Sequence, residues 1–216
     1  MTPWDQRAAR VLVRPLRHTG ITPNQLTLVT IVIAWSGAGL LSTGDATMMN
    51  WGAALFVSAR FLDHFDGELA RLTGRSSRLG YYLDYLAGAL SYAAMFAAIG
   101  AGLSQGPLGM WAWALGLAGT ACALLAMPVN LGIDRALDTD DAIGYPAFAG
   151  FELEDGIYLL APLTWLGWLA PFFVLAGIGA CVYMAWTLLC LCHLLLWPFL
   201  SVFVQLEGPL PLSSCG

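Results

Sequence analysis

The chain has 216 residues, of which 58% are hydrophobic and 11% are charged, and its formal net charge at pH 7 is -5. Its mean hydropathy of +0.70 excludes an ordinary water-soluble domain and indicates a helical protein that crosses the membrane several times. All of its basic residues except histidine are arginine, and they fall into a few clusters. This pattern favours contact with membranes and phosphate groups and gives no indication of a nucleic-acid partner.

Residues 1–20 are expected to form an amphipathic helix at the membrane surface. Arginines recur at the spacing of one helical face, at Arg7, Arg10, Arg14 and Arg17. Trp4, Val11 and Leu12 supply apolar surface, and a helix of this kind typically lies on anionic lipid. The alternative is a solvated arm whose arginines only set the orientation of the later segments.

Six membrane-spanning helices are expected to follow, because six apolar segments are each long enough to cross a hydrocarbon core of about 30 Å. They cover residues 25–42, 46–73, 79–104, 108–133, 157–177 and 178–206. Short turns are predicted at 44–45, 105–107 and 177–179, where glycine and proline gather. The predicted fold is therefore an all-α polytopic membrane protein, with an interfacial helix at 1–20, a six-helix domain at 21–206 and a tail at 207–216.

The distribution of arginine predicts how these helices are oriented. Arginines lie before the first expected span, between the second and third, and between the fourth and fifth, whereas the intervening turns have none. Since cytoplasmic segments carry the excess of positive charge, these segments and both termini are expected on the cytoplasmic side.

The second expected span carries a face of charged and small residues, which is a functional signal because an ionisable group in hydrocarbon is costly unless it is neutralised. At roughly 100° per residue, its members lie within little more than a third of the helix circumference. They are Asp63, Asp66, Gly67, Ala70 and Arg71.

A second polar face follows on the next helix, where Gly80, Asp84 and Gly88 recur every four residues. Three carboxylates brought together by two such faces would repel one another unless a cation lay between them. Mg²⁺, Mn²⁺ and Ca²⁺ take oxygen ligands of this kind, and the planar guanidinium of Arg71 suits a phosphate. The combination indicates a metal-bridged diphosphate. The alternative is a structural salt-bridge network between two transmembrane helices.

Seven of these residues have the spacing Asp63-x2-Asp66-Gly67-x2-Ala70-Arg71-x8-Gly80-x3-Asp84. This pattern resembles the signature of the CDP-alcohol phosphotransferases, membrane enzymes that move a substituted phosphoryl group from a CDP-linked donor to an alcohol. The resemblance implies that the three aspartates bind one or two Mg²⁺ or Mn²⁺ ions and that the other four residues line a CDP pocket. It also implies release of CMP, a phospholipid product if the donor is CDP-diacylglycerol, and a homodimer.

The family pattern has one more aspartate, four residues after the third, and Gly88 occupies that position here. In the family this aspartate is a metal ligand and the expected general base, and glycine can serve as neither. Three explanations are open. The chain is a weakened or inactive relative that binds donor without turnover, the position was changed deliberately, or another carboxylate has taken over. Glu152, Glu154 and Asp155 are the candidates for such a replacement, although carboxylates also gather at helix starts for structural reasons.

Two arginines are candidates for binding the acceptor. Arg135 follows the fourth expected span, at the start of the polar loop 134–155, and is either a ligand for an acceptor phosphate or an interfacial anchor. Arg60 lies one helical turn before Asp63 and is expected to pair with it or to reach a phosphate. The sequence does not distinguish glycerol phosphate, inositol phosphate, serine, choline and ethanolamine as acceptors.

Overall fold

The computed structural model describes residues 4–137 and 153–206, and every regular element within these ranges is a helix. In chain order they are α1 (Trp4–Leu12), the 3₁₀ helix η1 (Arg14–His18), α2 (Pro23–Leu41), α3 (Ala46–Thr73), α4 (Arg78–Leu103), α5 (Met110–Leu137), the 3₁₀ helix η2 (Leu153–Leu159), α6 (Leu160–Trp165) and α7 (Leu169–Leu206).

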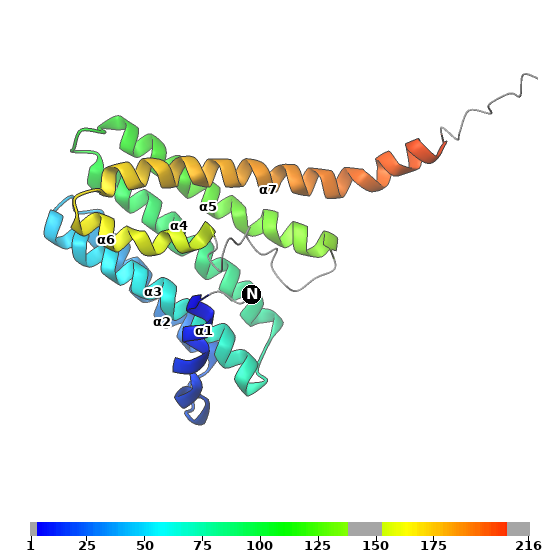
Figure 1. Cartoon of the computed structure of the whole chain (residues 1–216), viewed down its shortest axis with the longest axis horizontal. Helices are drawn as coiled ribbons and strands as arrows, with labels where there is room; N and C mark the ends of the chain where they lie inside the picture. Colours follow the sequence, from blue (N-terminus) through cyan, green and yellow to red (C-terminus); the bar gives the residue numbers. More distant parts are fainter. Residues whose placement is uncertain (1–3, 138–152, 207–216) are drawn as a thin grey trace, which may run out of the picture.

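Helix α2 packs on both α3 and α4, while α5 packs on α4 and α7, and α1 and α6 each pack on α3. The turns after α2, α4 and α6 gather at one end of the molecule, on the left in Figure 1, and the turn from α3 to α4 lies at the other end. Four described helices are long and apolar enough to cross a membrane: α2, α4, α5 and α7. The predicted count of six spans stays a prediction.

Local side-chain chemistry fixes the ends of α3 and α4. The backbone N–H of Met48 donates to the carboxylate of Asp45 at 2.9 Å, which begins α3. Gly74 ends the helix in a left-handed conformation with φ of 65°, which glycine adopts without strain. The backbone N–H of Gly80 then donates to the Ser77 hydroxyl at 3.0 Å, so α4 begins after a short turn.

Small residues allow the long helices to approach one another closely. A Cβ atom at Gly37 of α2 would lie 2.7 Å from the carbonyl oxygen of Gly52 on α3, and one at Gly100 of α4 would lie 2.8 Å from that of Ala112 on α5. Contacts of this kind are typical of helix pairs in membranes. Fully buried side chains fill the core between these helices, including Leu41, Phe56, Ile99, Leu160 and Phe173.

The predicted turn at 177–179 is wrong, because α7 runs through these residues without a break. Glycine within an apolar helix weakens it by about 1 kcal/mol but does not by itself end it, and a Cβ at Gly177 would lie 3.5 Å from the Leu115 side chain of α5. The turn lies instead at Gly167, whose φ is 76°. The expected span at 157–177 is therefore divided among η2, α6 and the start of α7.

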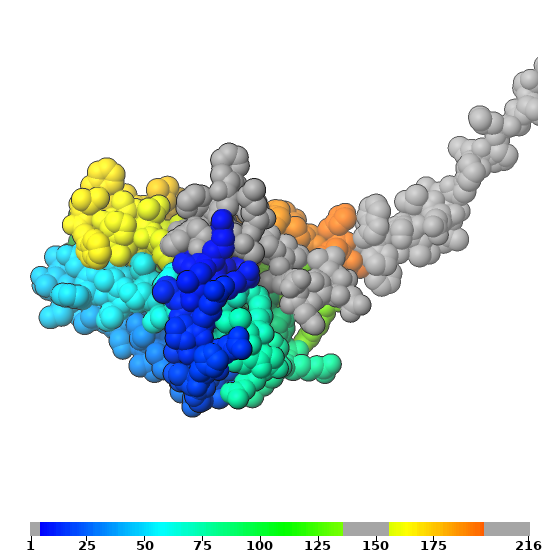
Figure 2. All heavy atoms as spheres, turned by 60° about the horizontal axis from the view of Figure 1, so that its bottom comes forward, coloured from blue at the N-terminus to red at the C-terminus, as the bar shows by residue number. Residues whose placement is uncertain are grey.

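The N-terminal segment lies on the outer surface of the molecule, where its residues are blue in Figure 2. Ala9 and Val13 are buried against Phe65 and Leu69 of α3. The predicted single helix is shorter than expected, since α1 ends at Leu12 and η1 follows. Contact of this segment with lipid stays a prediction.

Candidate metal centre

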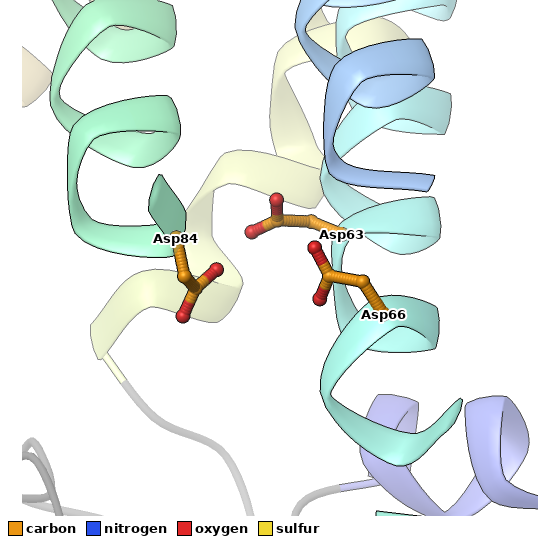
Figure 3. A group of neighbouring side chains, drawn as sticks. All are labelled: Asp63, Asp66 and Asp84. Atoms are coloured by element: carbon orange, nitrogen blue, oxygen red, sulfur yellow. The ribbon is translucent and has the colours of Figure 1, made fainter. Parts of the chain in front are cut away.

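Three aspartates from two helices meet between α3 and α4. Asp63 and Asp66 of α3 point toward Asp84 of α4 in Figure 3, and one carboxylate oxygen of each lies within 4.8 Å of the others. The spacing of three residues places the first two on one face of α3. Helix α2 packs on both α3 and α4 and so sets the separation across which the third carboxylate faces them.

Two hydrogen bonds orient Asp66, which is only 6% exposed. The hydroxyl of Thr27 on α2 donates to its Oδ2 atom, and the backbone N–H of Gly67 donates to its Oδ1 atom at 2.6 Å. Thr27 is a site residue that the sequence analysis missed. It lies 39 positions away along the chain, and no local pattern connects it to the motif.

Arg60 orients the neighbouring carboxylate. Its Nη1 atom donates to Oδ2 of Asp63, and its guanidinium lies 5.2 Å from the centre of the Tyr92 ring on α4, within the range of a cation–π contact. Of the two expectations for Arg60, the structure shows the pair with Asp63. Because Arg60 is buried, its observed contacts support a role in holding this carboxylate.

Open space lies beside the aspartates on both helices. Among the described residues, a Cβ atom at Gly67 or at Gly88 would meet no atom within 4 Å. At Gly80 it would lie 3.2 Å from the Ser77 hydroxyl oxygen and 3.4 Å from the side-chain oxygen of Asn24 at the start of α2. Gly80 thus allows the start of α2 to approach α4, and Asn24 is a second residue near the motif that the sequence analysis did not select.

The arginine of the motif is held by a neighbour on its own helix. Arg71 is exposed over 64% of its side chain. Its Nη1 atom donates to Oε1 of Glu68 at 2.7 Å. Glu68 also accepts two hydrogen bonds from Arg10 of α1, at 3.1 and 3.3 Å. These hydrogen bonds, and then the charge of Glu68, raise the pKa of the Arg10 guanidinium above its usual value.

The family of this chain is shown by its sequence over most of its length. The family described as CDP-alcohol phosphatidyltransferase matches residues 20–182, a range that contains all seven motif residues. The chain belongs to the CDP-alcohol phosphatidyltransferase family. Together with the four long apolar helices, this makes it an integral membrane protein.

Several members of the family are similar in sequence. The chain is 39% identical to an archaetidylinositol phosphate synthase of Pyrococcus horikoshii over 92 residues, which cover 41% of this chain and 46% of the relative. It is 30% identical to a CDP-diacylglycerol–serine O-phosphatidyltransferase of Mycobacterium leprae over 157 residues, covering 68% and 50%. The chain therefore spans about half the length of these relatives.

The fold is also that of a solved phosphatidylinositol phosphate synthase. The phosphatidylinositol phosphate synthase of Mycobacterium tuberculosis with CDP-DAG bound superposes with a TM-score of 0.62 at 20% identity, covering 86% of this chain and 94% of that chain. The same enzyme in complex with manganese and citrate gives a TM-score of 0.63 at 20% identity, with coverages of 85% and 88%.

The structure describes only some of the other residues that the sequence analysis selected for the site. Helix α5 continues to Leu137, so Arg135 is an exposed residue on a helix and not part of the expected loop. Glu152 lies outside the described residues. Glu154 and Asp155 belong to η2, whose ribbon appears in pale yellow behind the aspartates in Figure 3, but their side chains also lie outside the described part.

A buried carboxylate beside Arg135 was not selected from the sequence. Asp134 is 4% exposed, and its Oδ2 atom accepts hydrogen bonds from the hydroxyls of Tyr81 and Tyr85, each at 2.6 Å. These tyrosines flank Asp84 on α4. The contact joins α5 to the part of α4 that carries the third aspartate of the motif.

Proposed function

We propose that this protein transfers a phosphatidyl group from a CDP-linked lipid donor, such as CDP-diacylglycerol, to an alcohol and releases CMP. The observation that carries the proposal is the group of three aspartates from α3 and α4, with carboxylate oxygens within 4.8 Å, in the spacing of the family motif. A family relative named for transfer to serine and a structural neighbour solved with CDP-DAG support the donor.

Asp63, Asp66 and Asp84 would hold one or two Mg²⁺ or Mn²⁺ ions. Three carboxylates this close fit a hard divalent cation, because they would otherwise repel one another. The neighbour solved with manganese supports this assignment. An ion held there would supply positive charge to neutralise the diphosphate and to stabilise the leaving CMP.

The chain's own residues would bind and orient the donor. The space beside Gly67, together with Ala70 and Gly80, would accommodate the CDP group, and Arg71 would contact its phosphates. The acceptor hydroxyl oxygen then attacks the phosphorus of the phosphatidyl group, and the bond from that phosphorus to CMP breaks. Arg135 would bind the acceptor where the acceptor carries a phosphate.

The proton of the acceptor hydroxyl needs a base, and Gly88 does not provide one. Glu152, Glu154 and Asp155 are the carboxylates that would replace it. A second candidate function follows from the same glycine: the protein binds the CDP-linked donor or lipid without turnover. The two functions share the metal centre and differ only in the fate of the donor.

The deciding experiment measures CMP release by the purified protein from CDP-diacylglycerol. A panel of serine, glycerol phosphate, inositol phosphate, choline and ethanolamine would identify the acceptor, and Asp84→Asn is the control for activity at the proposed site. CMP release that needs Mg²⁺ or Mn²⁺ and disappears in the control would support the transferase. Metal-dependent CDP binding without CMP release would support the second function, and the absence of both results would contradict the proposal.

We also propose that the metal centre opens toward the cytoplasm and that the protein forms a homodimer. Arginines lie in the turn from α3 to α4 and in α1, which packs on α3. The exposed apolar faces of α5 and α7 would supply the dimer surface. Cysteine labels near Gly74 and Asp140 should react from the cytoplasmic side and one near Gly106 from the opposite side. Labelling of the first and last from the same side would contradict this orientation.

A further inference from the structure

Glu68 joins two arginines from different helices beside the donor site. It lies inside the motif, between Gly67 and Ala70, yet only 3% of it is exposed. Arg10 of α1 donates to both carboxylate oxygens of Glu68, from Nε to Oε2 at 3.1 Å and from Nη2 to Oε1 at 3.3 Å. Arg71 of α3 shares only Oε1, through Nη1 at 2.7 Å.

This arrangement limits how far Arg71 is drawn onto its own helix. A carboxylate and a guanidinium prefer a pair of parallel hydrogen bonds. Glu68 forms this pair with Arg10, and Arg71 shares only Oε1 with it. The single bond uses one nitrogen of Arg71, and the side chain remains 64% exposed.

We propose that Arg10 is a positioning residue for the donor site. It holds Glu68, so that Arg71 keeps most of its guanidinium available to the donor's diphosphate. The inference rests on the proposed function, because it assigns Arg71 to that diphosphate. It also gives α1 a role beyond contact with lipid. The basic face of this segment then contains one arginine that acts within the protein.

The attachment of α1 does not depend on Arg10 alone. Asp5 lies 2.8 Å from Nε2 of His64 on α3 and accepts a hydrogen bond from the Tyr158 hydroxyl of η2 at 3.0 Å. Ala9 and Val13 are buried against α3. Replacing Arg10 is therefore expected to change the partners of Glu68 while α1 stays in place.

The test compares two arginines of the same basic segment. Arg10→Ala and Arg14→Ala each remove one positive charge, and Arg14 is likewise exposed but lies in η1, beyond the contact with Glu68. The affinity of the purified full chain for CDP in the presence of Mn²⁺ should fall about threefold to tenfold for Arg10→Ala and stay unchanged for Arg14→Ala. Arg10→Lys should fall between them, because an ammonium group does not pair with both oxygens in parallel.

A double substitution separates positioning from simple loss of structure. Glu68→Gln removes the negative charge that would draw Arg71 away, so Arg10→Ala combined with Glu68→Gln should bind CDP more tightly than Arg10→Ala alone. A general weakening of the fold would make the double variant worse. Equal CDP affinity of the wild type and Arg10→Ala, or no recovery in the double variant, would overturn the inference alone. Absence of metal-dependent CDP binding by the wild type would overturn the proposed function and the inference with it.

Discussion

The two halves of the candidate metal centre differ in the burial of their carboxylates and in the side chains that they supply. On α3, Asp66 is buried and fixed by a hydroxyl from α2 and a backbone N–H, and Asp63 pairs with the buried Arg60. On α4, Asp84 is exposed, and the position one turn later is Gly88, beside open space. The first half is pre-organised by neighbours from two helices. The second has glycine at the position where the family resemblance implies a fourth aspartate.

This difference separates binding from turnover. A ligand atom held in place by neighbouring groups loses little freedom when it binds a metal, so removing one of the groups that hold Asp66 is expected to weaken metal and donor affinity. A base must be close to the acceptor hydroxyl, and the family resemblance assigns that task to the α4 position that Gly88 occupies. Substitutions on the two helices should therefore affect different measurements.

The largest effect is expected from Gly88→Asp. A Cβ atom at position 88 meets no described atom within 4 Å, and the new side chain would stand one turn from Asp84 on the same face of α4. Restoring a base should raise the rate of CMP release by about 10²- to 10⁴-fold, with little change in CDP affinity. Gly88→Asn, of similar size but without a carboxylate, is the control.

A fast wild-type protein would break the comparison between the halves. In that case Glu152→Gln, Glu154→Gln and Asp155→Asn should be assayed, and a loss of rate in one of them would identify a replacement base. Gly88→Asp would then bring no gain.

The next effect concerns metal-dependent binding. Asp66→Asn keeps the size of the side chain but removes the charge that a divalent ion requires, so CDP should no longer raise the thermal stability of the protein in Mn²⁺ or Mg²⁺. Thermal unfolding with CDP, with and without metal, measures this. Equal stabilisation of the wild type in excess chelator would contradict the metal assignment.

Thr27→Val tests whether the pre-organisation of Asp66 matters. The substitution keeps the shape but removes the hydroxyl donor, and the loss of such an outer contact is expected to weaken metal affinity by roughly tenfold to a hundredfold. Thr30→Val is the matched control, because Thr30 is also buried on α2 but donates only to the carbonyl oxygen of Leu26 in its own helix, at 3.0 Å. Equal effects of the two substitutions would show that Thr27 acts through packing.

The sequence predicts the grouping of the three aspartates, because the information for it is local. The positions of Asp63, Asp66 and Asp84 follow from helical spacing and from a short connection between two helices. The bounds of α3 are as predicted, because Asp45 caps one end and Gly74 terminates the other. Glu68 stood in the same stretch, and a charged residue within an apolar segment was the available signal for it.

The remaining features depend on contacts between distant segments. The bonds from Thr27 to Asp66 and from Arg10 to Glu68 join residues 39 and 58 positions apart. Helical periodicity relates residues three or four positions apart and does not indicate such pairs. The turn at 177–179 failed for a related reason, since composition marks where glycine is present, whereas only backbone conformation shows that Gly167 turns and Gly177 does not.

The smallest effect is expected on stability, at the hydrogen bonds that join α4 to Asp134 of α5. Tyr85→Phe keeps the ring but removes one of the two hydroxyls that donate to Oδ2 of Asp134. Because the second hydroxyl, from Tyr81, is retained, the free energy of unfolding should fall by only about 1 kcal/mol. Tyr82→Phe, at an exposed neighbouring position, is the control in denaturant unfolding of the detergent-solubilised protein. If Tyr85→Phe instead lowered CDP affinity at unchanged stability, the position of Asp84 would depend on this contact with α5, just as that of Asp66 is expected to depend on Thr27.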